Sequence, residues 1–150
     1  MGTVNILLVD DDRNLVTTLS YGLRKAMGEA ISVAVCFSGS EALSMLATQA
    51  FDVVISDFNM PGPSGLEFLN KVRQNYREIT LVLITGYGTD TIEEGARQLG
   101  VGYITKPFEP SFLVQLIKGL IQSQDTSGNT ENASRIMDKL GKPAGSSQSI

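Results

Sequence analysis

Residues 4–12 read VNILLVDDD, a short apolar run that is followed directly by three aspartates. An apolar run without polar alternation is typical of a strand buried on both faces, as strands are inside a parallel sheet. Ligands of open α/β sheets bind beyond the carboxyl ends of the strands, so the aspartates stand where a functional site is expected. This stretch therefore predicts a parallel α/β fold and marks one edge of its sheet.

The same pattern repeats along the rest of the chain. Further apolar runs of strand length follow, and after each comes a segment whose apolar residues recur at helical spacing. Such alternation is typical of βα units, so we expect an α/β fold with a doubly wound, five-stranded parallel sheet flanked by five helices. Ser38 and Glu41 predict a capping box at one helix start. The expected strands are 4–9, 31–37, 53–55, 80–84 and 103–105, and the expected helices include 13–27, 41–47, 66–72, 92–99 and 111–121.

Length and composition predict one domain and a tail. The chain has 150 residues, of which 42% are hydrophobic, so it can bury one sizeable core. The end of the chain is rich in Ser, Gln, Asn and Gly and offers little apolar surface for burial. We expect a domain over residues 1–122 and a flexible polar tail or linker over residues 123–150. Within the tail, residues 133–140 fit one short helix, which is marginal in water on its own.

Charge and residue types exclude several functions. The net charge of -4 disfavours phosphate surfaces, so we expect no direct nucleic-acid binding and no membrane binding. The absence of histidine excludes Ser-His-Asp and Cys-His catalysis and His-ligated zinc. Cys36, the single cysteine, is expected to be a buried thiol. The sequence has no signal-like start and no apolar run of membrane length, so we expect a cytoplasmic protein.

Polar residues follow most of the expected strands. Asp10–Asp12 follow the first strand, Asp57 the third, Thr85 the fourth and Lys106 the fifth. Taken singly, each has an ordinary explanation: Asp12 is a helix cap, Asp57 a turn residue, Thr85 a strand residue and Lys106 an exposed lysine. If the strands are adjacent, however, these side chains meet at one edge of the sheet.

Carboxylates that are brought together repel one another unless a cation compensates their charge. A site of carboxylates without His or paired Cys favours magnesium over calcium or manganese, and the spacing does not fit an EF-hand. Asp57 beside a metal, Lys106 and Thr85 has what phosphoryl transfer to an aspartate requires: a nucleophile, positive charge and a hydrogen-bond donor. We expect Lys106 to gain a strong partner only when a phosphoryl group is present.

Four motifs together resemble one family. VDDD (9–12), SDFNMPGPSG (56–65), ITG (84–86) and YITKPF (103–108) resemble, in this order, the response-regulator receiver domain of two-component signalling, the CheY-like family. The resemblance covers about residues 4–121. It implies the flavodoxin-like strand order 2-1-3-4-5, which CheY itself exemplifies. It also implies Mg²⁺-dependent phosphorylation by a sensor histidine kinase or a histidine phosphotransfer protein, with no turnover of an external substrate.

The resemblance also implies the roles of individual residues. The downstream target, which the sequence does not identify, would bind a surface of the fourth helix, fifth strand and fifth helix, and this surface also permits a homodimer. The implied roles are phosphoacceptor for Asp57, metal ligand for Asp11, Asp57 and the Asn59 carbonyl, metal ligand through water for Asp10, phosphoryl contact for Thr85 and Lys106, and switch residue for Thr85 and Tyr103.

Three other functions are alternatives. A phosphatase of the haloacid-dehalogenase type also uses an Asp nucleophile on a first strand, but its Asp-x-Asp is followed by Gly-Thr or similar, whereas Arg13-Asn14 stands here. A receiver-like binding module that is never phosphorylated is disfavoured by the intact set of acidic residues, threonine and lysine. A flavodoxin-type cofactor binder is disfavoured because a phosphate-cradling loop after the first strand should be rich in Gly, Ser and Thr.

Overall fold

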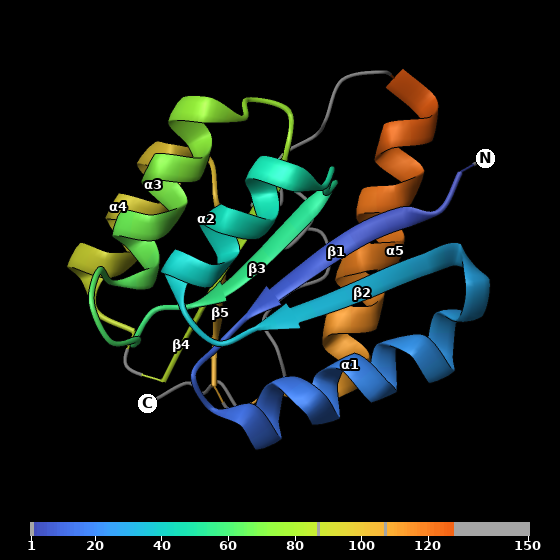
Figure 1. The fold of residues 1–150 in the computed structure, drawn as a ribbon, viewed down its shortest axis with the longest axis horizontal. Helices are drawn as coiled ribbons and strands as arrows, with labels where there is room; N and C mark the ends of the chain where they lie inside the picture. Colours follow the sequence, from blue (N-terminus) through green and yellow to red (C-terminus); the bar gives the residue numbers. More distant parts are fainter. Residues whose placement is uncertain (1, 87, 107, 128–150) are drawn as a thin grey trace.

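The computed structural model describes residues 2–86, 88–106 and 108–127. In this part of the chain, five parallel strands form one sheet in the order β2-β1-β3-β4-β5 (Figure 1). The predicted fold class and the strand order implied by the resemblance are thus confirmed. The strands are β1 (Val4–Val9), β2 (Ile31–Cys36), β3 (Val53–Asp57), β4 (Thr80–Thr85) and β5 (Gly102–Thr105).

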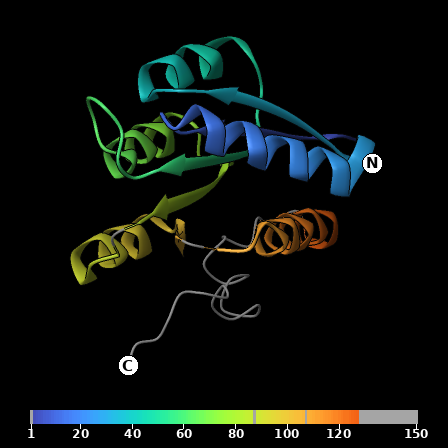
Figure 2. The same cartoon turned by 90° about the horizontal axis from the view of Figure 1, so that it is seen from below.

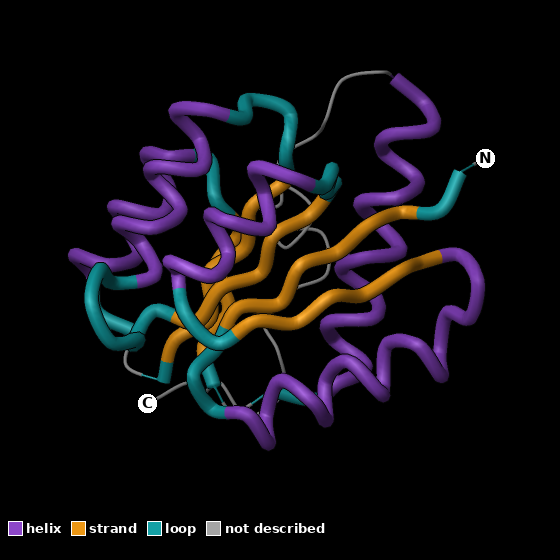
Figure 3. Tube along the Cα trace, viewed as in Figure 1, coloured by secondary structure: helices purple, strands orange, loops and turns teal. Residues whose placement is uncertain are grey.

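Five helices cover the two faces of this sheet (Figure 3). Figure 2 shows α1 and α5 on one side and α2, α3 and α4 on the other, as a doubly wound fold requires. A short 3₁₀ turn, Gly28–Ala30, follows the first helix. The helices are α1 (Arg13–Met27), α2 (Gly39–Thr48), α3 (Gly65–Asn75), α4 (Asp90–Leu99) and α5 (Pro110–Ser127).

The core consists of one apolar layer on each face of the sheet. In β1, Ile6 and Leu8 pack with the layer of α1 and α5, whereas Leu7 and Val9 pack with the layer of α2, α3 and α4. All four side chains are buried, which explains why β1 shows no polar alternation in the sequence. Two tightly packed layers hold the strand ends in place, and the strand ends carry the polar residues.

Helix caps fix where the helices begin. Asp12 caps α1 as expected, because its side chain accepts a hydrogen bond from the amide of Leu15. The capping box predicted at α2 forms only by half: Ser38 accepts from the Glu41 amide, but the Glu41 carboxylate accepts from Phe37, one residue earlier than expected. The amide of Phe37 follows the end of β2 and has no strand partner, so it competes successfully for this carboxylate.

Several boundaries differ from the expected ones. Asp57 and Thr85 are the last residues of their strands, whereas the expected strands end before them, at 55 and 84. The last helix continues from the expected end at 121 to Ser127, because its sequence there holds no Gly or Pro and each added residue gains a backbone hydrogen bond. The expected short helix at 133–140 lies outside the described residues. Within the described chain, no helix combines the length and apolarity needed to cross a membrane.

Gly65, the first residue of α3, ties this helix closely to the end of β3. Its amide donates to the carbonyl oxygen of Phe58 at 2.7 Å, and a Cβ atom at this position would overlap the carbonyl oxygen of Asp57. The backbone therefore has no room for a side chain at Gly65. The position of the Asp57 peptide depends on this close approach.

We predict that Gly65→Ala lowers the free energy of unfolding by about 1–3 kcal/mol, because backbone atoms must move to admit the methyl group. Gly22→Ala in the middle of α1 is the matched control. A Cβ at Gly22 meets nothing within 4 Å, so this variant should gain about 0.5–1 kcal/mol from helix propensity. Thermal and urea denaturation followed by circular dichroism measures both. Equal stability of the two variants would contradict the close approach at Gly65.

Candidate functional site

The polar residues predicted from the strand ends do meet at one edge of the sheet. Asp10 directly follows β1, and the register pairs Val9 with Ser56, so Asp57 lies beside it at the end of β3. Thr85 ends β4 and is paired with Thr105, the last residue of β5. The carboxyl ends of four strands thus supply the site.

Three carboxylates come close together at this edge. Asp10, Asp11 and Asp57 each place a carboxylate oxygen within 4.8 Å of the others. Asp10 and Asp57 are buried, with 7% and 5% of their surface exposed, whereas Asp11 is exposed. Asp12 is not a member of this group, because its carboxylate caps α1. The group is one that can hold a metal ion.

Lys106 supplies the positive charge that balances this site. Its Nζ lies 2.8 Å from Oδ1 of Asp57 and 3.7 Å from Oδ2 of Asp10. The backbone amide of Lys106 donates to the carbonyl of Thr85 at 2.8 Å, which anchors the residue beside β4. The expectation that Lys106 gains a strong partner only with a phosphoryl group is therefore wrong. Two buried carboxylates side by side need a cation, and the ammonium group reaches them from the end of β5, on the far side of β4.

The electrostatics of the site follow from burial and like charge. The pKa of Asp10 is raised to about 6, mainly by burial and also by the charge of Asp57, although the Asp12 amide that donates to Oδ1 at 2.9 Å acts in the opposite direction. Burial lowers the pKa of Lys106, but the hydrogen bond to Asp57 and the attraction of Asp57 and Asp10 outweigh this effect and leave it above its ordinary value. Ionising Asp10 is costly without a further cation, and a bound divalent ion would remove that cost.

The remaining predicted residues lie around this cluster. Thr85 is fully buried, and Asn59 is exposed in the loop between β3 and α3. Tyr103 is half-buried in β5, and its hydroxyl group lies against Gly88 in the loop before α4. Burial and the nearby carboxylates of α4 raise the pKa of Tyr103. The expected buried thiol is present: Cys36 has 3% of its surface exposed, and burial raises its pKa to about 12.

One residue near the site was missed in the sequence. Arg13, two residues after Asp11, places its guanidinium carbon 3.9 Å from the centre of the Phe37 ring. Its position in the sequence could have revealed it. A cation at the first residue of a helix is unfavourable because it opposes the helix dipole, so such a residue needs a compensating contact. The stack on Phe37 offsets this cost.

Comparison with known proteins identifies the family. The sequence model of the response regulator receiver domain matches residues 6–118 of this chain. The chain belongs to this family. The resemblance of the four motifs is thereby confirmed, and this receiver domain is one of those found in two-component response regulators.

Two relatives and one solved structure show how far the similarity reaches. The response regulator protein FleR of Pseudomonas aeruginosa is 41% identical over 113 residues, which are 75% of this chain and 23% of FleR. The hydrogenase transcriptional regulatory protein HoxA of Cupriavidus necator is 32% identical over 126 residues, 83% of this chain and 25% of HoxA. The chain thus spans about a quarter of the length of these curated relatives. The response regulator DrrB of Thermotoga maritima superposes with a TM-score of 0.71 at 27% identity, over 80% of this chain and 53% of DrrB.

The raised pKa of Asp10 sets the sign of its effect on stability. Between its ordinary value of 3.8 and the folded value of about 6, the folded state binds a proton that the unfolded state does not. The free energy of unfolding therefore falls as the pH rises through this range, and the penalty is complete above it.

We predict that Asp10→Asn raises the free energy of unfolding of the metal-free protein at pH 7.5 by roughly 1–3 kcal/mol. The gain should shrink toward zero at about pH 3 and below, where Asp10 is protonated in both states. Urea denaturation in EDTA at the two pH values measures it. Glu29→Gln, at an exposed carboxylate, is the control and should change stability little. If Asp10→Asn is less stable than wild type at pH 7.5, the carboxylates do not repel one another as inferred.

Proposed function

We propose that this receiver domain accepts a phosphoryl group on Asp57 from a phosphohistidine of a sensor histidine kinase or a histidine phosphotransfer protein. The observation that carries the proposal is the convergence of Asp10, Asp11 and Asp57 with Lys106, whose ammonium lies 2.8 Å from Oδ1 of Asp57. Asp57 and Asp10 are both buried beside the lysine, but only Asp57 lies within hydrogen-bond distance of its ammonium group, at 2.8 Å against 3.7 Å for Asp10.

In the proposed reaction, a carboxylate oxygen of Asp57 attacks the phosphorus atom of the phosphohistidine. The new oxygen–phosphorus bond forms as the nitrogen–phosphorus bond breaks, and the departing imidazole nitrogen takes up a proton. Lys106 neutralises the charge on the phosphoryl oxygens, and the hydroxyl group of Thr85 donates a hydrogen bond to one of them. Lys106 must then move its ammonium group from the free carboxylate to the phosphoryl group.

The donor set fits Mg²⁺, which prefers carboxylate and carbonyl oxygens and takes one or two protein carboxylates. We propose that Asp11, Asp57 and the backbone carbonyl of Asn59 hold the ion directly and that Asp10 holds it through a water molecule. When bound, the ion neutralises the carboxylates and the phosphoryl oxygens. The balance of charge at the site supports this assignment, since a single lysine faces three carboxylates.

The alternatives differ in what they predict for Asp57. The family match leaves no support for a phosphatase of the haloacid-dehalogenase type. A receiver-like binding module would have the same fold but would never be phosphorylated on Asp57. An experiment must therefore distinguish this alternative from the proposed phosphoacceptor.

We predict that treatment with phosphoramidate and Mg²⁺ adds the mass of one phosphoryl group to the wild-type protein and that Asp57→Asn abolishes this gain, because the nucleophile is lost. Asp12→Asn is the matched control. Asparagine caps a helix as well as aspartate does, so α1 should be retained and labelling should remain at the wild-type level. Intact-protein mass spectrometry with and without Mg²⁺ measures the gain. Labelling of Asp57→Asn at the wild-type rate, or none in wild type, would refute the proposal.

We further propose that Thr85 and Tyr103 transmit the phosphorylation. A phosphoryl group of about -1.5 to -2 charge gives the Thr85 hydroxyl a new acceptor and draws the following loop inward. The hydroxyl group of Tyr103 lies against Gly88 of that loop, so a shift of Gly88 changes the space available to the ring. The resulting change in α4, β5 and α5 would alter the surface for a downstream target or for a second copy of the chain.

We predict that beryllofluoride, a phosphoryl mimic, shifts the NMR signals of the Tyr103 ring and the Gly88 amide together with those of the Asp57 pocket. A ligand moves such an equilibrium only by its different affinity for the two states, so the free protein should already sample the second position of Tyr103. Thr85→Ala should retain the shifts near Asp57 and lose those at Tyr103. Shifts confined to the Asp57 pocket in the wild type would show that this route is wrong.

We infer that the receiver unit ends near residue 122, where the polar sequence begins, and that residues 123–150 serve as a polar tail or linker. Residues 123–127 continue α5 as helix, and residues 128–150 lie outside the described part of the chain. The family match, which ends at residue 118, supports a boundary in this region.

A further inference from the structure

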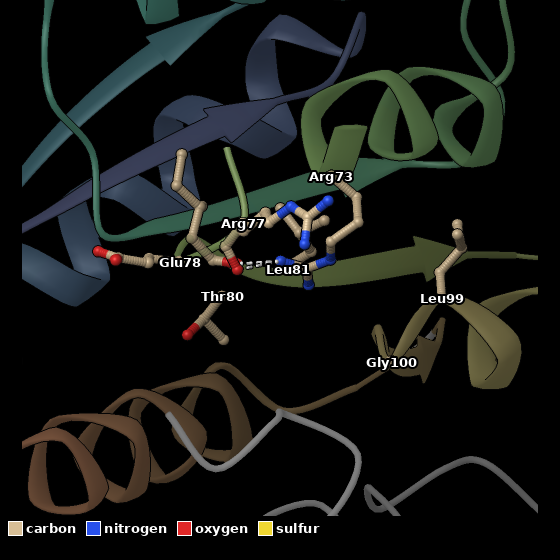
Figure 4. A pocket seen from close by; sticks show the side chains of 8 residues that line it. Arg73, Arg77, Glu78, Thr80, Leu81, Leu99 and Gly100 are labelled. Carbon is tan, nitrogen blue, oxygen red and sulfur yellow. Dashed lines mark hydrogen bonds between the residues drawn. The ribbon is translucent and has the colours of Figure 1, made fainter. Parts of the chain in front are cut away.

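A second polar feature lies at the opposite end of the sheet from Asp57. A pocket of about 250 Å³ opens where the end of α3, the start of β4 and the end of α4 meet (Figure 4). Its lining includes two arginines, Arg73 from α3 and Arg77 from the loop that follows. The pocket shares no residue with the acidic site.

Arg73 is held in place by the backbone. It is half-buried, and its Nη1 donates to the carbonyl oxygen of Arg77 at 3.1 Å and to that of Ile79 at 2.8 Å. Two bonds from one nitrogen fix the plane of the guanidinium group and use two of its five N–H donors. The remaining donors of Arg73 are therefore pre-oriented, as bidentate recognition of an oxyanion requires.

Within the described part of the chain, neither arginine is paired with a carboxylate. Among the side chains that the structure describes, no carboxylate lies within 4.0 Å of either guanidinium group. Glu78 lines the pocket as well, but Figure 4 shows its carboxylate directed away from Arg73 and Arg77. Partial burial lowers the pKa of Arg73, which is the cost of placing a cation there without an anionic partner.

The carbonyl groups at the end of α4 accept hydrogen bonds from backbone amides rather than from the two arginines. The Gly100 amide donates to the carbonyls of Ala96 and Arg97, and the Val101 amide donates to that of Ala96. The helix end is thus capped by its own backbone. Ile79, Leu81 and Leu99 contribute apolar side chains to the lining, so the cationic groups face a cavity with partly apolar walls.

We propose that this pocket binds a small oxyanion, a phosphate or a carboxylate, through Arg73 and Arg77. A volume of about 250 Å³ lies just below the range of roughly 300–1,000 Å³ that is usual for larger organic ligands, so the occupant is small. The bound anion ties the end of α3 to the start of β4 and the end of α4. The site is independent of the phosphorylation of Asp57.

The test is an NMR titration of the metal-free protein with inorganic phosphate and, separately, with citrate, against sodium chloride of matched ionic strength. We expect saturable shifts of the Leu81 and Gly100 amides that chloride does not produce. Saturation by one anion only identifies the chemistry as phosphate or as carboxylate. Shifts that do not saturate with either anion, or that chloride reproduces, overturn the proposal.

Matched variants locate the binding. Arg77→Gln should weaken binding about tenfold, as expected for loss of a charge-assisted contact. The variant should fold, because within the described residues Arg77 takes part in a side-chain hydrogen bond only through its backbone carbonyl. Arg97→Gln is the control, since Arg97 is exposed on α4 and pairs with Glu93 and Glu94. Equal effects of the two variants would overturn the assignment.

Asp57→Asn separates this site from the phosphoacceptor. The variant should bind the anion as wild type does, whatever its behaviour in phosphorylation. Loss of the shifts in Asp57→Asn would place the anion at the acidic site and refute the pocket.

Discussion

The contact between Lys106 and the buried carboxylates of Asp57 and Asp10 is the interaction on which the rest of the site depends. Two carboxylates at adjacent strand ends repel each other in a partly desolvated place, and the raised pKa of Asp10 records that cost. The lysine offsets part of it at 2.8 Å and 3.7 Å. The rest of this electrostatic cost is offset by packing, because an apolar layer on each face of the sheet holds β1 and β3 in register behind the site.

This arrangement links stability to function. Because the ammonium group of Lys106 already contacts Asp57, the proposed phosphorylation would not give it a first partner but would exchange one acceptor for another. The backbone amide of Lys106 donates to the carbonyl of Thr85, so the lysine is linked directly to the end of β4. A change of charge at Asp57 can therefore reach Thr85 through one hydrogen bond. Such a switch works by the difference in interaction between two states, not by the strength of either contact alone.

The sequence predicts most of this fold for a simple physical reason. Strands buried on both faces must be apolar throughout, so β1 and its neighbours are visible as runs, and polar residues at their ends stand out. The strand order is not visible in spacing and came from the resemblance. What the sequence could not predict depends on competition in three dimensions: Glu41 caps Phe37 rather than Ser38, and Lys106 pairs without a phosphoryl group. The two-arginine pocket was missed because its residues read as ordinary helix-end cations.

The doubly wound architecture explains why the two edges of the sheet differ in charge. Every helix begins near the carboxyl edge, where its amide groups favour anions, and ends near the amino edge, where its carbonyl groups favour cations. Asp12 at the start of α1 and Arg73 in the last turn of α3 both satisfy this rule. Asp57 and Arg77 are not needed to balance a helix end. Each adds a second charge of the same sign beside a residue that already balances the local helix dipole. Surplus charge of one sign, held close by a rigid backbone, lowers the cost of binding an ion of the other sign. At the carboxyl edge the proposed ion is a divalent cation, and at the amino edge the proposed ion is an oxyanion.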